Sequence, residues 1–344
     1  MAKTLQDTRI QLQRGEVTSE RLVAEALASA SSAEGQGDKV FIKVYEEQAM
    51  VQAKAIDQVR KSGVELHPLC GIPISIKDLF DVAGEITLSG SIVRKKSVPA
   101  NSDAHIVTKL RAAGAILIGR TNMTEFAFSG LGINPHYGTP LNPWDRKTGR
   151  IPGGSSSGAA ISVTDNMAAA AIGTDTGGSV RIPSALCGLT GFKPTAARVS
   201  KEGAFPLSTT LDSIGPLANS VSCCSLLDQT MRGAAVNVLL DKPLDGLTLA
   251  IPKTIVLDDM DRTVAKRFEN VVTRLSESGV RIVEHPCSIL SQIPLANSKG
   301  GFAAVEAFHT LRDLLEQDES NFDPRVAVRV RRGAEMLGVE YLEL

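Results

Sequence analysis

Hydrophobic positions in the first sixty residues follow the spacing of two amphipathic helices. The segment 18–30 gathers its apolar residues on one stripe behind Thr18, a suitable N-cap, namely Leu22, Val23, Ala26 and Leu27. The segment 46–63 has the composition of a second helix that stops near Gly63. The N-terminal part of the chain is therefore predicted to be helical.

Short apolar runs then alternate with helical segments. The run "GIPISI" at 71–76 predicts a buried strand, and "AILIG" at 115–119 predicts another. Between them lies a helical pattern at 102–114 that Ser102 or Asp103 could cap. This order predicts a βαβ unit and an α/β fold.

The alternation continues to the end of the chain. A short helix at 159–164 precedes a strand of small residues at 167–173, and strands at 247–252 and 280–285 flank a helix at 262–279. The apolar stripe of that last helix comprises Val264, Phe268, Val271, Val272 and Leu275. Without a repeat, a low-complexity linker or a clear boundary, the pattern predicts a single domain over 1–344. The chain closes on a helical pattern at 323–344, which fits either a native helical terminus or a chain cut short.

Composition excludes several classes of protein. The 344 residues are 43% hydrophobic, enough for a large core, and 37 basic against 38 acidic residues leave a net charge of −1, which argues against a nucleic-acid partner. No apolar run approaches the roughly 20 residues of a membrane span, and the N-terminus lacks the apolar stretch of a secretion signal. The cysteines are odd in number and show no CxxC spacing, which predicts reduced thiols and no zinc site: Cys70, Cys187, Cys223, Cys224 and Cys287. We expect a cytoplasmic protein with neither a membrane nor a metal partner.

Two glycine-rich stretches stand out, at 150–163 and 173–195. Each abuts a patterned strand or helix, which favours tight turns over flexible linkers. Neither has the lysine followed by Ser or Thr of a phosphate-binding loop. The first fits GxSxG with Ser156 at its centre, but the turn-rich "NPWDRKTGRIP" before it is not the strand that a nucleophile elbow needs.

A lysine offers a different chemistry for these stretches. Lys77 follows the predicted strand 71–76, where burial would lower the pKa of its ammonium group and make the neutral amine a base. Such a base can accept a proton from a serine hydroxyl, directly or through a second serine, so that one serine attacks a carbonyl. Taken alone, a lysine after a strand is more often solvated and a glycine-serine turn is more often only a turn.

Several motifs taken together resemble the amidase signature family. They are "GIPISIKD" at 71–78, "GRTNMTEFAF" at 119–128, "NPWDRKTGRIPGGSSSGAA" at 142–160, "GTDTGGSVRIPSALCGLTGFKPT" at 173–195 and "STTLDSIGPLA" at 208–218. They occur in order and densely over about 65–220. The resemblance implies a mixed, twisted central β-sheet flanked by α-helices on both faces.

The resemblance also implies the catalytic residues. Ser179 is the implied nucleophile, Lys77 the base, and Ser155 a bridging serine that follows a cis peptide bond. Ser155 and Ser179 lie 24 positions apart, as in the family, which selects Ser155 over Ser156 and Ser157. No cofactor is implied.

Further roles follow from the same resemblance. Backbone N–H groups of Thr176, Gly177 and Gly178 are the implied oxyanion hole. The residues implied to support that loop are Thr174, Asp175 and Arg181. Met123 and Phe126 either line an acyl pocket or belong to the ordinary core.

A Ser/His/Asp triad is the alternative catalytic arrangement. The chain has five histidines, none in a recognisable catalytic context: His67, His105, His136, His285 and His309. We expect them to be surface or structural residues.

The resemblance leaves two activities and one inactive state to compare. The first is a free amidase that cleaves a small carboxylic amide to an acid and ammonia or an amine, through an acyl-enzyme on Ser179. The second is the glutamine-hydrolysing component of a glutamyl-tRNA(Gln) amidotransferase, from which "ARVSKEGAFPLSTTLDSIGPLA" departs. Because members of the family usually run beyond 344 residues, the third is a truncated, inactive remnant. We expect the amidase, with a small amide as partner, and leave a homodimer open.

Overall fold

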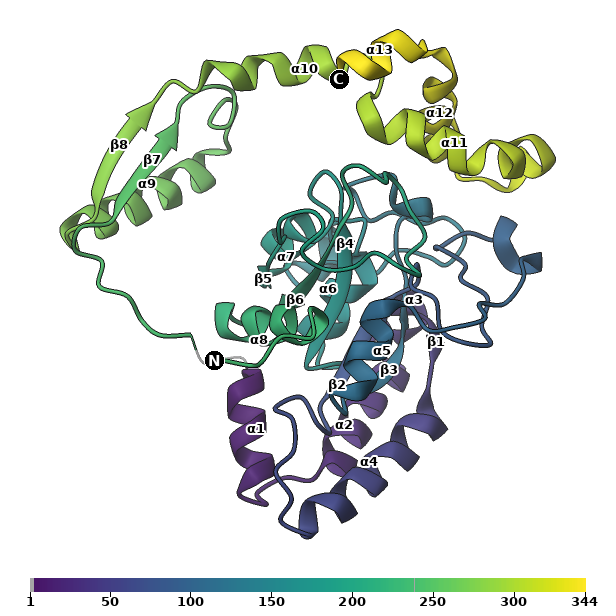
Figure 1. Ribbon diagram of the computed structural model, residues 1–344, viewed down its shortest axis with the longest axis vertical. Helices are drawn as coiled ribbons and strands as arrows, with labels where there is room; N and C mark the ends of the chain where they lie inside the picture. The colour runs from purple at the N-terminus through teal and green to yellow at the C-terminus, as the bar shows by residue number, and fades with distance from the viewer. Residues whose placement is uncertain (1–2, 238) are drawn as a thin grey trace.

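The centre of the protein is a six-stranded mixed β-sheet (Figure 1). The computed structural model describes residues 3–237 and 239–344. The strands lie in the order β1-β3-β2-β4-β6-β5, where β1 is Phe41–Val44, β2 Pro73–Lys77, β3 Ile116–Thr121, β4 Ala170–Asp175, β5 Thr190–Gly191 and β6 Ser213–Ala218. Strand β2 runs parallel to β3 and to β4, and the other pairs are antiparallel.

The predicted βαβ unit is confirmed by β2, helix α5 (His105–Ala112) and β3. Its predicted cap is wrong, because α5 has Ala104 at its N-cap position. The Asp103 carboxylate instead accepts a hydrogen bond of 2.9 Å from the N–H of Ala83. The Asp103 side chain, which the local sequence predicts as a helix cap, therefore bonds to a distant segment of the chain instead.

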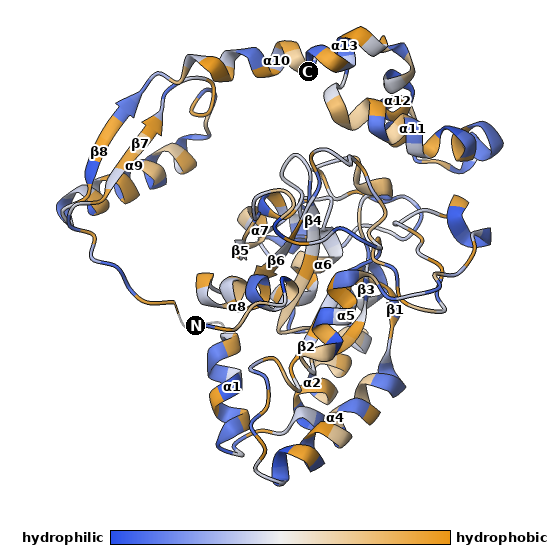
Figure 2. Cartoon of the chain, in the orientation of Figure 1, coloured by the Kyte–Doolittle hydropathy of each residue, from blue (hydrophilic) through white to orange (hydrophobic). Residues whose placement is uncertain are grey.

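Helices cover both faces of the sheet, in agreement with the predicted fold class. One core contains apolar side chains of α1 (Leu5–Gln13), α5, α8 (Val221–Met231), α11 (Gly301–Asp318) and α12 (Pro324–Arg332). The other contains side chains of α2 (Ser19–Ser31), α4 (Glu46–Lys61), α6 (Ser157–Thr164) and α7 (Arg181–Cys187). Apolar residues of the sheet contribute to both cores, and Figure 2 shows hydrophobic and hydrophilic residues interspersed along helices such as α4 and α5.

Helix α2 illustrates how the pattern of the sequence becomes packing. Thr18 caps it by accepting a hydrogen bond from the N–H of Arg21, and the predicted stripe is buried, as Leu22, Val23, Ala26 and Leu27 show. Helix α4 likewise matches its predicted range, although only Ala49 and Ala53 are buried on it. Among the described residues, no helix is both long and apolar enough to span a bilayer.

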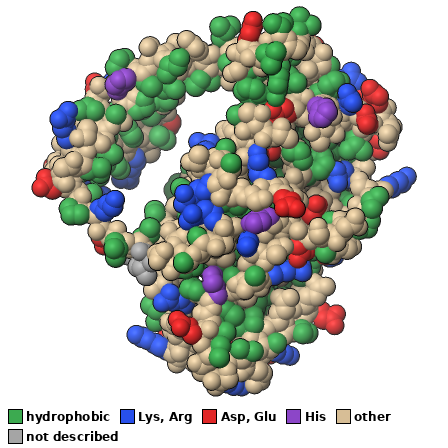
Figure 3. All heavy atoms as spheres, viewed as in Figure 1, with side chains coloured by type: hydrophobic (Ala, Val, Ile, Leu, Met, Phe, Trp, Pro, Cys, Tyr) green, Lys and Arg blue, Asp and Glu red, His purple; other side chains and the backbone are tan. Residues whose placement is uncertain are grey.

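Strands β7 (Thr248–Pro252) and β8 (Arg281–His285) form a separate two-stranded parallel sheet with helix α9 (Arg262–Glu277). These elements match their predicted ranges. The apolar stripe of α9 is not buried, because Val264 and Val271 are 56% and 52% exposed. Figure 3 shows an open gap between this unit and the rest of the molecule.

The chain then returns to the main body through helix α10 (Ile293–Ala296) and helices α11 to α13 (Figure 1). The predicted terminal helical pattern is divided into α12 and α13 (Gly338–Glu343). Within the part of the chain that the structure describes, the second sheet does not pair with the first. The single domain over 1–344 stays a prediction.

Candidate active site

Lys77 ends strand β2 and has no exposed surface. Its Nζ donates hydrogen bonds of 2.7 Å to Ser155 Oγ and 2.9 Å to Thr174 Oγ1. Burial lowers the pKa of Lys77 to about 7, although the negative charges of Asp212 and Asp175 oppose that shift. At neutral pH a large fraction of this amine is therefore unprotonated and able to accept a proton.

Ser155 lies in the loop before α6, and the peptide bond between Gly154 and Ser155 is cis, as predicted. Gly153 has a φ of +78°, in the left-handed region that favours glycine. A Cβ on Gly154 would come within 2.5 Å of the backbone nitrogen of Gly132. The two glycines are thus required by backbone conformation and by the close approach of another loop.

Ser179 lies in the loop between β4 and α7, two residues before Arg181, and it is 6% exposed. Its carbonyl oxygen accepts a hydrogen bond of 3.3 Å from the N–H of Ser156, which ties the two glycine-rich loops together. Among the described residues, no hydrogen bond joins the hydroxyls of Ser155 and Ser179. The structure therefore brings Lys77 and Ser155 into direct contact and places Ser179 on the adjoining loop.

The loop from Asp175 to Ser179 is organised around the Asp175 carboxylate. It accepts hydrogen bonds from the N–H groups of Gly178 (2.8 Å) and Val180 (3.1 Å) and forms an ion pair of 2.8 Å with Arg181. Burial raises the pKa of Asp175, but the hydrogen bonds and charge of Arg181 outweigh it, so the pKa lies below its usual value. Asp175 and Arg181 thus hold the loop as the supporting residues would.

The predicted oxyanion donors differ in availability. The Gly178 N–H is already bonded to Asp175, so in this conformation it does not fit the predicted role. Within the described ranges, the N–H groups of Thr176, Gly177 and Ser179 donate no hydrogen bond, and a Cβ on Gly177 would meet nothing within 4 Å. The predicted donors Thr176 and Gly177 thus stay candidates for binding an oxyanion, and the N–H of Ser179 is a further one.

Asp212 is a residue of this site that the sequence did not reveal. Its carboxylate accepts a hydrogen bond from the Thr176 hydroxyl and two from the N–H groups of Leu207 (2.9 Å) and Ser208 (3.1 Å). Burial raises the pKa of Asp212 above its usual value, although these hydrogen bonds oppose the shift. The only signal in the sequence was its place inside the motif "STTLDSIGPLA".

Met123 and Phe126 are both buried in the core that also contains side chains of α1, α5, α8, α11 and α12. The ring of Phe126 packs against Phe205 and Phe322 at centroid distances of 5.7 and 5.3 Å. These surroundings agree with the expectation that the two residues belong to the ordinary core. Contact of Met123 and Phe126 with a substrate stays a prediction.

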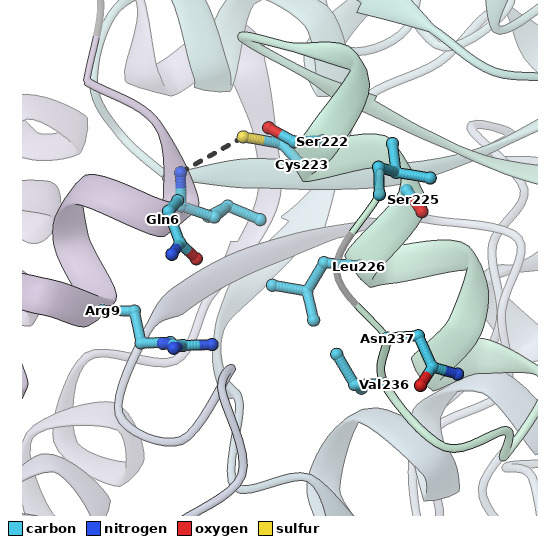
Figure 4. Close-up of a pocket in the computed structure, with 10 residues that line it drawn as sticks. Gln6, Arg9, Ser222, Cys223, Ser225, Leu226, Val236 and Asn237 are labelled. Atoms are coloured by element: carbon cyan, nitrogen blue, oxygen red, sulfur yellow. Dashed lines mark hydrogen bonds between the residues drawn. The ribbon is translucent and has the colours of Figure 1, made fainter. Parts of the chain in front are cut away.

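Two cavities differ in their relation to these residues. A cavity of about 190 Å³ is lined by Thr174 and Asp212 together with Lys201 and Phe205, and the Thr174 hydroxyl accepts a hydrogen bond from the Lys77 amine. Another, of about 170 Å³, lies between α1 and α8 and is shown in Figure 4, where Cys223 approaches the start of α1. The second is not lined by any residue of the loops that carry the candidate triad.

The comparison with known families decides the identity of the fold. The family model named Amidase matches residues 21–340. The chain belongs to the amidase family. This membership confirms the predicted resemblance.

Related proteins within this family are named for different activities. This amidase-family chain is 36% identical over 294 residues to 2-amino-5-chloromuconic acid deaminase of Comamonas testosteroni, covering 84% of the chain and 63% of that protein. It is 38% identical over 295 residues to a component of the glutamyl-tRNA(Gln) amidotransferase of Chromohalobacter salexigens, covering 82% and 60%. The chain thus spans 60% to 63% of the length of these curated relatives.

A solved structure described as an amidase matches with a TM-score of 0.88 and 31% identity, covering 99% of this chain and 76% of that one. The predicted mixed α/β fold is confirmed by this match.

Proposed function

We propose that this protein is an amidase that hydrolyses the carbon–nitrogen bond of a small carboxylic amide, through an acyl-enzyme on Ser179. The observation that carries the proposal is the buried Lys77 amine, with a pKa of about 7, at 2.7 Å from the Ser155 hydroxyl. Membership of the amidase family and the hydrogen bond that joins the Ser179 carbonyl to the N–H of Ser156, the residue after Ser155, support the same chemistry.

In the proposed acylation step, neutral Lys77 takes the proton of Ser155 while Ser155 takes the proton of Ser179. The Ser179 oxygen attacks the amide carbonyl, and the N–H groups of Gly177 and Ser179 stabilise the oxyanion. The Lys77 proton returns through Ser155 to the leaving nitrogen, so ammonia or an amine departs. Hydrogen bonds between catalytic groups often tighten only when substrate binds, which is how the Ser155–Ser179 contact would form.

In the proposed deacylation step, water replaces the amine. Its proton passes to Lys77 by the same route, the hydroxide attacks the acyl carbonyl, and the proton returns to the Ser179 oxygen as the acid leaves. Each cycle thus consumes one amide and one water. No cofactor enters either step.

The experiment is ammonia release from a panel of small carboxylic amides, measured beside free glutamine. We expect turnover of at least one simple amide to exceed that of glutamine by more than tenfold. The amidotransferase relative supports the alternative, a glutamine-hydrolysing component of a larger enzyme. Glutamine as the preferred substrate, with turnover raised by a partner protein, would favour that alternative.

The pH dependence of turnover is expected to follow Lys77. Because its pKa is lowered to about 7, the amine is protonated and inactive below that pH and neutral above it. Activity should therefore rise about tenfold per pH unit below pH 7 and level off above it. Lys77→Arg keeps a permanent positive charge and should lose most activity at every pH. Near-normal turnover of Lys77→Arg would contradict the role of Lys77 as the base.

A further inference from the structure

Helix α11 brings a carboxylate from the last part of the chain to the loops of the candidate active site. Figure 1 shows α11 lying beyond the loops at the end of β4. Glu306 on this helix is buried, with 7% of its surface exposed. It accepts hydrogen bonds from the Ser208 hydroxyl, from the Thr210 hydroxyl and N–H (3.0 Å), and from the hydroxyl of Tyr341 (2.8 Å).

In the described part of the chain, Glu306 is held by hydrogen bonds from neutral groups and not by ion pairs. Among the described residues, no lysine, arginine or histidine forms an ion pair with it. Burial raises the pKa of Glu306, but the hydrogen bonds from Ser208, Thr210 and Tyr341 outweigh burial and lower it below its usual value. A buried ionised carboxylate that meets only neutral donors fixes the positions of those donors strongly.

The turn held by Glu306 is the same turn that carries Asp212. The Ser208 hydroxyl donates to Glu306 and accepts from the N–H of Leu211 at 3.1 Å, while the Ser208 N–H donates to Asp212 at 3.1 Å. Asp212 in turn accepts the hydrogen bond of the Thr176 hydroxyl. One continuous set of hydrogen bonds therefore runs from α11 to the loop whose N–H groups face the reacting carbonyl in the proposed mechanism.

The same turn also affects the proposed base through the charge of Asp212. The negative charge of Asp212 acts on Lys77 and opposes the lowering of its pKa. A displacement of Asp212 would thus change both the orientation of Thr176 and the charge near the amine. Small displacements of positioning groups can lower a rate by about a hundredfold.

We propose that Glu306 is a positioning residue, which holds the 207–212 turn so that Asp212 fixes the Thr176 loop in the geometry that binds the oxyanion. This inference rests on the proposed amide hydrolysis at Ser179. It assigns a role in the reaction to the C-terminal helices, outside the glycine-rich stretches.

The test compares Glu306→Ala and Glu306→Gln with Glu316→Ala in the full chain. Glu316 is an exposed glutamate on the same helix and is the matched control. We expect Glu306→Ala to lower kcat by roughly 10- to 100-fold with KM within about threefold, since the loss concerns the transition state. Glu306→Gln keeps the volume and one acceptor and should lose less, and Glu316→Ala should match the parent.

A double-mutant cycle separates positioning from simple stabilisation. Thr176→Val removes the hydroxyl that Asp212 holds. If Glu306 acts through Asp212 and Thr176, the double variant with Glu306→Ala should be about as slow as the slower single variant. Multiplied losses in kcat, or a kcat of folded Glu306→Gln and Glu306→Ala equal to that of Glu316→Ala, would overturn the inference.

Two further measurements keep the result interpretable. Thermal unfolding of each variant shows whether it is folded at the assay temperature. If Glu306→Ala is unfolded there, the kinetics of Glu306→Gln provide the test. Ser179→Ala is assayed in parallel. Full activity in Ser179→Ala would overturn the proposed function and this inference with it, whereas loss of activity there together with parental kinetics in both Glu306 variants would overturn this inference alone.

Discussion

Replacing Ser179 by alanine is expected to abolish turnover. The hydroxyl is the atom that forms the acyl-enzyme, and removal of a serine nucleophile typically lowers kcat on the order of 10⁶-fold. The fold should persist, because in the described residues the Ser179 contact to the neighbouring loop is made by its backbone carbonyl. Measurement of amide turnover beside thermal unfolding checks both parts.

Covalent labelling gives this prediction a second readout. A serine-directed phosphonylating reagent should modify Ser179 in the parent and leave Ser179→Ala unmodified, as located by mass spectrometry of peptides. Modification of Ser156 in its place would support the nucleophile-elbow alternative. The structure already weakens that alternative, since the segment before Ser156 contains only the short 3₁₀ turn Arg146–Thr148 and no strand.

Local pattern predicted much of the fold because it depends on periodicity and short-range capping. Helix α2 begins behind Thr18 and buries the stripe that its spacing indicates. Strands β2 and β3 lie close to their predicted ranges because a short apolar run bounded by turn residues is typical of a buried strand. The start of α5 was predicted wrongly because Asp103 bonds to Ala83, 20 positions away.

The candidate triad was predicted through motif resemblance, whereas its supports depend on contacts across the chain. The hydrogen bond from the Gly178 N–H to Asp175 depends on the orientation of the Asp175 side chain, and the spacing of residues in the sequence does not predict that orientation. The bond from Thr176 to Asp212 joins residues 36 positions apart, and that from Ser208 to Glu306 joins residues 98 positions apart. Pattern along the sequence could not pair them, because only the tertiary fold brings these segments together.

Helix α9 shows the opposite limit of periodicity. Its apolar stripe is plain in the sequence, and the helix lies where the stripe predicts. Yet no residue of α9 is buried. An amphipathic pattern predicts which side of a helix is apolar, and burial depends on whether another layer covers that side.

Ser155→Ala is expected to lower kcat by about three orders of magnitude with a smaller effect on KM. The Ser155 hydroxyl accepts a hydrogen bond from Lys77 in the resting structure and would carry the proton from Ser179 to it during acylation. Positioned proton transfer typically contributes 10²- to 10⁴-fold, and it acts in the transition state, so the loss should fall on kcat. Steady-state kinetics on the best amide of the panel measures the division between kcat and KM.

Ser157→Ala is the matched control for this substitution, because Ser157 lies two residues along the same chain segment and is equally buried. Its hydroxyl makes no hydrogen bond among the described residues, so its removal breaks no contact of that kind. Both variants remove one buried hydroxyl from the same chain segment and differ in whether that oxygen touches Lys77. A loss confined to Ser155→Ala would therefore report proton transfer, whereas equal and mild losses in the two variants would mean that Lys77 takes its proton by a route that does not pass through Ser155.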